Sequence, residues 1–159
     1  SCDYLLGRCA EPMGKAAKEA PAASGEDKDK LTEEQKMLLD SQKLIFSMVS
    51  EKDGGKLEKA VRSYLSLAVY RIFRVIFSAN PKNDRRFFTL SSPAADGFTL
   101  SAMELKKARA EAIAVSGEMQ NTPITTNTLT GTYPEHASSL FNQVKQCEDE
   151  INAVQDKDE

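Results

Sequence analysis

Residues 56–79 read KLEKAVRSYLSLAVYRIFRVIFSA, and this stretch decides the fold. Its apolar side chains recur every three or four residues, which is the spacing of one face of an α-helix. That face comprises Leu57, Val61, Tyr64, Leu65, Ala68, Ile72, Val75, Ile76 and Ala79. The second half is apolar almost all round except at Arg71 and Arg74, yet it is shorter than the roughly 20 apolar residues that cross a bilayer. The stretch therefore predicts the most buried helix of a bundle, and Asn80 and Pro81 end it because the residue before proline avoids helical angles.

Three more segments, one before this stretch and two after it, show the same periodicity. Two of them start with the pattern of a capping box, Thr32 with Gln35 and Ser101 with Glu104. Pro134 suits the first turn of the last helix. The four helices are expected at about residues 32–52, 56–79, 101–120 and 134–155.

The apolar faces of the last two segments define the rest of the expected core. In residues 101–120 the face comprises Leu105, Ala108, Ala112, Val115 and Met119. In residues 134–155 it comprises Ala137, Leu140, Phe141, Val144, Cys147, Ile151 and Val154. Because Cys147 lies on this stripe, we expect a buried free thiol there.

Four amphipathic helices without a competing strand pattern predict an all-α protein. We expect an up-down-up-down four-helix bundle over residues 31–159. Residues 1–30 are expected to be a partly flexible N-terminal arm, since their second half is rich in Ala, Lys, Glu, Asp and Pro. Residues 82–100 and 121–133 form connections longer than the roughly two to eight residues usual in bundles, so they are candidate binding elements.

The inventory of reactive side chains argues against an enzyme. The chain of 159 residues has a single histidine, His136, which excludes metal sites that need two or more imidazoles. Phosphate-binding glycine loops, paired-histidine zinc motifs and Cys-x-x-Cys motifs are absent from the sequence. We therefore expect no catalytic residue, no cofactor and no metal, and we assign His136 a surface or capping role.

Charge is distributed unevenly along the chain. Residues 56–86 contain eight basic and two acidic residues, a net charge of +6, whereas the whole chain has a net charge of −3 and the remainder therefore −9. Residues 145–159 contain six carboxylates and two lysines. This asymmetry favours docking of the basic part on an acidic surface, and the net acidic chain makes nucleic acid a poor candidate partner. A merely solvated charged face is the alternative.

The basic residues at the end of the second helix lie beside two phenylalanines. The candidate partner-binding residues are Arg71, Arg74, Lys82, Arg85, Arg86, Phe87 and Phe88. Aromatic and arginine side chains are enriched in the centres of protein interfaces. In the alternative interpretation, Phe87 and Phe88 cover the end of the bundle, and Arg71 and Arg74 pair with a neighbouring helix.

Three cysteines leave the disulfide state open. Their odd number excludes a fully paired set within the chain. Cys2 and Cys9 could form a disulfide only if Gly7 breaks a helix there, because seven residues of helix separate two α-carbons by about 10.5 Å. Three reduced thiols are the alternative.

A short motif suggests a family. The run VIFSANPKNDRR, residues 75–86, resembles the helix-end motif of PsbQ-like extrinsic proteins of photosystem II, and Ser63-Tyr64-Leu65 resembles the S-Y-L of the same helix. The resemblance, to a divergent algal form, implies a four-helix bundle on the lumenal face of photosystem II in the chloroplast thylakoid. Such a subunit stabilises the oxygen-evolving centre without catalysing a step. The resemblance also implies that Lys82, Arg85 and Arg86 are docking residues.

The expected partners are therefore the photosystem II core and its neighbouring extrinsic subunits. The chain would be peripheral to the membrane, with no transmembrane span. An accessory or adaptor subunit of another large membrane complex, for example a mitochondrial one, is the alternative function.

Overall fold

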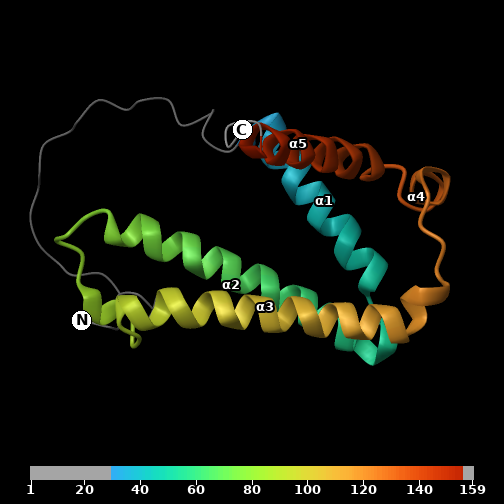
Figure 1. Ribbon diagram of the computed structural model, residues 1–159. Helices are drawn as coiled ribbons and strands as arrows, with labels where there is room; N and C mark the ends of the chain where they lie inside the picture. Colours follow the sequence, from blue (N-terminus) through green and yellow to red (C-terminus); the bar gives the residue numbers. More distant parts are fainter. Residues whose placement is uncertain (1–29, 156–159) are drawn as a thin grey trace, which may run out of the picture. The chain divides into compact units, whose positions relative to one another are not determined.

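The computed structural model describes residues 30–155, and within this range the chain is helical without a strand (Figure 1). The α-helices are α1 (Glu33–Val49), α2 (Lys56–Ser78), α3 (Ser92–Ser116), α4 (Thr126–Thr132) and α5 (Ala137–Gln155). Short 3-10 helices are η2 (Lys52–Gly55), η3 (Arg85–Phe87) and η4 (Glu118–Asn121). The all-α prediction is confirmed for this range. The expected N-terminal arm up to residue 29, with Cys2 and Cys9, lies outside the described residues.

Helix α1 begins at the expected capping box. The backbone N–H of Gln35 donates to Thr32 Oγ1 at 3.2 Å, and the Thr32 N–H donates to Gln35 Oε1 at 3.0 Å. After α1, Asp53, Gly54 and Gly55 adopt positive φ angles of 52°, 64° and 74°. Two successive glycines suit this reversal because they have no Cβ to clash in left-handed backbone angles.

Helix α3 begins at Ser92 and not at Ser101, so the expected capping box of Ser101 and Glu104 is wrong. Ser91 is the N-cap and a proline occupies the first turn, where its missing N–H costs no hydrogen bond. Ser101 Oγ instead donates to the Gly97 carbonyl at 3.2 Å inside the helix. Residues 92–100, which we expected to belong to the connection over residues 82–100, are therefore part of α3.

The threonine-rich connection expected over residues 121–133 contains a helix, α4. Its cap is a threonine pair: the Thr128 N–H donates to Thr125 Oγ1 at 3.1 Å, and the Thr125 N–H donates to Thr128 Oγ1 at 2.8 Å. Leu129 is the buried side chain of this short helix. Threonine is a poor helix former, so the sequence predicted a connection here. In the structure, paired threonine hydroxyls satisfy terminal N–H groups of the helix, and Leu129 packs inward.

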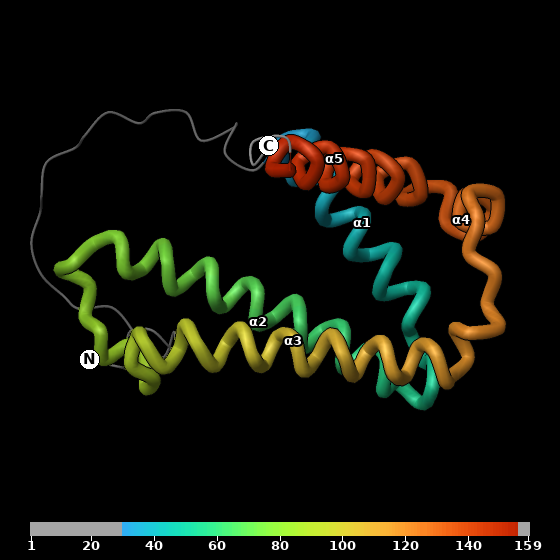
Figure 2. The backbone as a smooth tube through the Cα atoms, in the orientation of Figure 1, coloured from blue at the N-terminus to red at the C-terminus, as the bar shows by residue number. Residues whose placement is uncertain are grey.

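The helices associate as two pairs, α2 with α3 and α1 with α5. In Figure 2, α2 and α3 lie beside each other, and α1 runs from the C-terminal end of α5 toward the start of α2, at an angle to α5. In the α1–α5 pair, Leu44 packs with Ala137 and with Leu129 of α4, and Met48, Tyr133, Leu140 and Phe141 surround them. Met37, near the start of α1, lines a hollow with residues 145–153 of α5. The two helices therefore run antiparallel.

One end of the α2–α3 pair is held by a reciprocal contact that we call the clasp. The Asp53 N–H donates to Glu118 Oε1, and the Glu118 N–H donates to Asp53 Oδ1, both at 3.0 Å. Lys52 Nζ lies 3.3 Å from Glu118 Oε2. A side chain on Gly117 would collide with the Asp53 carboxylate. The clasp thus brings together the end of α1, the start of α2 and the end of α3.

Several faces expected in the core are exposed. On α2, Ile72, Val75 and Ile76 are 60–65% exposed, whereas Leu57, Ala60 and Arg74 are buried. On α5, Cys147 is exposed, and so are Val144, Ile151 and Val154. The prediction of a buried thiol at Cys147 is therefore wrong, because only the first turns of α5 pack into the cluster around Leu44.

The expected core face of α3 is also exposed. Leu105 and Val115 are 67% and 60% exposed, and the buried residues of α3 are Ala95 and Thr99. Small side chains at these two positions let α3 approach α2 closely. Periodicity showed that α3 has an apolar stripe but did not show which stripe contacts α2.

Candidate docking site

The end of α2 and the connection to α3 form the candidate site. We call Lys82, Arg85 and Arg86 the basic knuckle; all three are exposed. Beside it lies an aromatic cluster, which comprises Tyr70, Phe73, Phe77, Phe87 and Phe88. The knuckle and the cluster come from two elements, α2 and η3, which the chain brings back together across residues 79–84.

Three phenylalanines form the centre of the aromatic cluster. The ring centroids of Phe77 and Phe88 are 5.0 Å apart, those of Phe87 and Phe88 5.1 Å, and those of Phe77 and Phe87 5.2 Å. Edge-to-face and tilted rings at these distances attract one another beyond their burial. Phe87 nevertheless remains 52% exposed and Phe73 42%. The cluster therefore both covers the end of α2 and presents aromatic surface outward, so each of the two sequence-based interpretations applies to part of it.

Arg74 is buried beneath this cluster, with 7% of its surface exposed. Its Nη1 donates to Tyr70 Oη at 2.8 Å, and both terminal nitrogens lie 3.3 Å from the Leu90 carbonyl oxygen. Its guanidinium carbon lies 4.2 Å from the centroid of the Phe88 ring, a cation–π contact. Arg74 thus connects α2 to the segment before α3, and its charge is not presented to a partner. We correct its expected docking role to a structural one.

The turn between α2 and η3 is fixed by two asparagines. Asn83 Nδ2 donates to the Phe77 carbonyl at 2.8 Å, which satisfies an acceptor at the end of α2. The Lys82 N–H donates to Asn80 Oδ1 at 3.0 Å. These bonds set the backbone that carries the basic knuckle.

Asp84 shares its carboxylate with Arg86. It accepts hydrogen bonds from the Arg86 N–H at 3.0 Å, from Nε at 3.0 Å and from Nη2 at 2.8 Å. The side-chain bonds from Arg86, followed by its backbone N–H, hold the pKa of Asp84 below its ordinary value, and the same side-chain bonds raise the pKa of Arg86. Lys82 and Arg85 form no ion pair with any described residue. They are the free charges of the knuckle, and Arg86 is partly compensated.

Arg71 is half-buried on α2 and has no polar contact among residues 30–155. The structure thus brings together Phe87, Phe88 and Arg74, and it leaves Lys82 and Arg85 open to solvent. Sequence reasoning missed Tyr70 and Leu90, although Tyr70 lies one helical turn before Arg74 and could have been paired with it.

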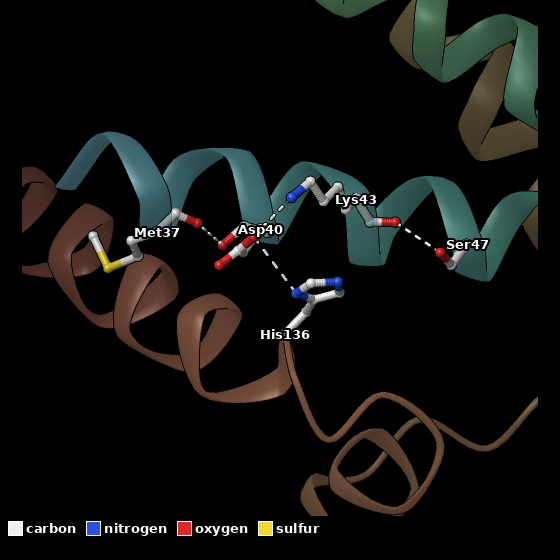
Figure 3. Close-up of polar contacts among 6 residues, drawn as sticks. Met37, Asp40, Lys43, Ser47 and His136 are labelled. Carbon is white, nitrogen blue, oxygen red and sulfur yellow. Dashed lines mark hydrogen bonds and ion pairs between the residues drawn. The ribbon is translucent and has the colours of Figure 1, made fainter. Parts of the chain in front are cut away.

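His136 lies close to the carboxylate of Asp40, a contact that the sequence did not suggest. Its Nδ1 lies 3.6 Å from Asp40 Oδ1, and Lys43 Nζ lies 3.2 Å from the same oxygen (Figure 3). Asp40 is buried. It lies on the same face of α1 as Met37 and Leu44, and that unexpected carboxylate in an apolar stripe was the available signal. No described serine or cysteine hydrogen-bonds to His136, so the contact ties α5 to α1 without assembling a nucleophile.

An apolar groove of about 1080 Å³ runs along α2 and α3 next to the clasp. Side chains from α1, α2, α3, η4 and the residues that follow line it; among them are Ile45, Val49, Leu57, Val61, Leu65, Ala110, Ala114 and Ile124. Lys107 and Glu111 stand among them as charged lining residues. Leu105, two positions from Lys107, points to a different side of α3.

The chain matches no protein-family model, no curated protein and no solved structure. Within the part of the chain that the structure describes, no group of three or more His, Cys, Asp or Glu side chains could hold a metal ion. None of the helices in this part has an apolar run long enough to span a bilayer.

Proposed function

We propose that this chain is a non-catalytic, PsbQ-like extrinsic subunit that docks on the lumenal side of photosystem II and stabilises the oxygen-evolving centre. The observation that carries the proposal is the basic knuckle. Lys82 and Arg85 are exposed and unpaired by described residues, and they stand on a turn that Asn80 and Asn83 hold in place.

The aromatic cluster supports a docking role. Phe73 and Phe87 keep about half of their surfaces exposed although they pack in a cluster of rings. An acidic partner surface would face the charges, and its apolar groups would cover the open rings, an arrangement that interface centres favour. Exposed charges of this kind steer association and lose strength in salt.

We further propose that the docked form is an up-down-up-down four-helix bundle. The open apolar side chains of α2, the groove beside the clasp and the stripe of Val144, Ile151 and Val154 are surfaces that water disfavours. Leu38 of α1 is 48% exposed, on the same face of α1 as Ile45, which lines the groove. Packing the α1–α5 pair along α2 and α3 would bury these faces together.

Rebinding to photosystem II membranes that have been stripped with 1 M NaCl tests the proposal. We expect the chain to bind at low salt and to be released at 1 M, where the screening length is about 3 Å. The double variant Arg85→Glu/Arg86→Glu should bind about tenfold more weakly or worse, because it places like charges against the acidic surface.

The matched control is Lys59→Glu/Arg109→Glu, which makes the same charge change on exposed residues of α2 and α3 that do not line the groove. It should bind like the parent chain, and far-UV circular dichroism should show unchanged helicity for both variants. Equal losses in the two variants would reject the knuckle as the docking site. Absence of binding to the membranes, or recovery of the native protein from mitochondria, would reject the photosystem and favour the alternative complex.

A further inference from the structure

The described structure fixes which ends of the helices would meet in the proposed bundle. The clasp joins the end of α1, the start of α2 and the end of α3. Helix α5 begins against Leu44 in the second half of α1 and runs back along it. The opposite end of the bundle therefore contains the start of α1, the end of α2, the start of α3 and the end of α5.

That opposite end carries both charge extremes of the chain. The basic knuckle follows α2, and Glu148, Asp149 and Glu150 lie in the last turns of α5. All three carboxylates are exposed and form no ion pair with a described residue. Residues 156–159, which continue the chain after α5, add three carboxylates and one lysine.

The helix lengths are consistent with the end of α5 lying next to the end of α2 in the proposed bundle. Helix α5 has 19 residues and α2 has 23, or about 28 Å and about 34 Å at 1.5 Å per residue. Helix α5 starts against Leu44, five residues or about 8 Å before the end of α1 at Val49, so in a closed bundle it would end about 36 Å from that end of α1, close to the level where α2 ends.

We infer that the acidic end of α5, residues 148–155, is the intramolecular partner of the basic knuckle, and that it competes there with the acidic surface of the docking partner. This inference rests on the proposed bundle and docking site, and it adds their regulation. The occupant is this segment of the same chain because its three carboxylates, a net charge of −3, complement the knuckle. Because α1 ends at the clasp and α5 runs antiparallel to α1, the end of α5 also points toward the end of the bundle that carries the knuckle.

Binding of fluorescein-labelled poly-L-glutamate to the full chain at low salt tests the inference. The variant Glu148→Gln/Asp149→Asn/Glu150→Gln should bind this acidic probe roughly threefold more tightly or better, because charges that lie within a screening length of the knuckle are removed. Adding Arg85→Gln/Arg86→Gln to that variant should abolish the gain.

The matched control is Glu58→Gln/Glu111→Gln/Glu135→Gln. It changes the net charge equally, but Glu58 and Glu111 lie toward the clasp end of α2 and α3, and Glu135 lies in the turn before α5. An equal gain in both triple variants would show a long-range charge effect and overturn the inference. So would a gain that survives the arginine substitutions, or a gain that grows with protein concentration and reveals a second copy as the source of the carboxylates.

The probe measurement needs no photosystem membrane, so the two proposals fail separately. A chain that does not rebind to the membranes but shows the gain with poly-L-glutamate rejects the proposed function and keeps the contact between α5 and the knuckle. A chain that rebinds to the membranes but shows no gain keeps the docking site and rejects its regulation.

Discussion

Arg74 is held by a carbonyl oxygen and two aromatic rings instead of a carboxylate. Its contacts with Tyr70, Phe88 and Leu90 join α2 to the segment that leads into α3. A buried guanidinium needs its hydrogen-bond partners, because burial removes the water that would otherwise solvate it. Arg74 therefore holds together the two ends of the segment that carries the basic knuckle.

We predict that Arg74→Met destabilises the fold by about 1–3 kcal/mol, the range for hydrogen bonds that involve a charged group. Arg71→Met, three residues earlier and without a polar contact, should change stability by about 0.5 kcal/mol or less. Urea unfolding followed by circular dichroism measures both. If Arg74→Met is as stable as the parent chain but rebinds more weakly to the membranes, Arg74 contributes to docking and its role is not merely structural.

Glu118 gives the clasp a pH dependence. The backbone N–H of Asp53 and then the Lys52 side chain stabilise its carboxylate, so its pKa lies below the ordinary value of 4.5. The stabilisation is complete above the pKa of the unfolded chain and is lost as the pH falls through the lower pKa of the folded chain.

Accordingly, Glu118→Gln should lower the melting temperature at pH 7, and the difference from the parent chain should shrink as the pH falls below about 4.3. Glu111→Gln in α3, which takes no part in the clasp, is the control and should show no such trend. A difference that stays constant down to pH 2 would mean that the Glu118 charge does not contribute to the clasp.

At the scale of elements, α1 and α5 are held by one small apolar cluster and by the contact of Asp40 with His136. Leu44 is fully buried between Leu129 and Ala137, and Asp40 meets His136 one turn earlier. Most of α5 beyond this point is exposed. The pairing of the two helices therefore depends strongly on the cluster.

Leu44→Ala should destabilise the α1–α5 pair by about 2–5 kcal/mol, because it removes buried methyl groups and leaves a cavity. Leu38→Ala, on the same helix but 48% exposed, should cost far less. Thermal melts and amide hydrogen exchange in α5 provide the measurement. Equal costs at the two positions would show that Leu38 is buried in solution, as in a closed bundle.

At the scale of the whole molecule, the question is whether the α1–α5 pair closes over α2 and α3. Cys147 lies about 15 Å along α5 from its start, which packs against Leu44 about 8 Å before the end of α1. Leu100, two helical turns before Lys107 on the same face of α3, lies about 24 Å from the end of α3 near the clasp. Closure along the groove would bring Cys147 and Leu100 to one level. Leu105, on another side of α3, would stay away from Cys147.

With Cys2 and Cys9 replaced by serine, Leu100→Cys should form an intrachain disulfide with Cys147 on mild oxidation, since closure can bring the α-carbons within about 7 Å. Leu105→Cys is the control and should not. Non-reducing gels and mass spectrometry distinguish the products. The reverse preference would exclude the proposed bundle, and dimers alone would indicate association between copies.

The sequence predicted the all-α class and the approximate positions of α1, α2 and α5, because spacing, capping residues and the glycines after α1 act locally. It also indicated the uneven charge and the grouping of arginines with Phe87 and Phe88. Local signals could not place the start of α3, since Ser91 with its proline and Ser101 both resemble helix caps. They also missed α4, whose threonines cap one another.

Only the tertiary structure decided which apolar face each helix buries. Ala95 and Thr99, not Leu105 and Val115, are buried on α3, and Arg74 lies under the aromatic cluster. Periodicity reports that a stripe exists, whereas its partner depends on close approach between helices far apart in the chain. For the same reason the contacts of Asp40 with His136 and of Asp53 with Glu118 emerged only when the helices were packed together.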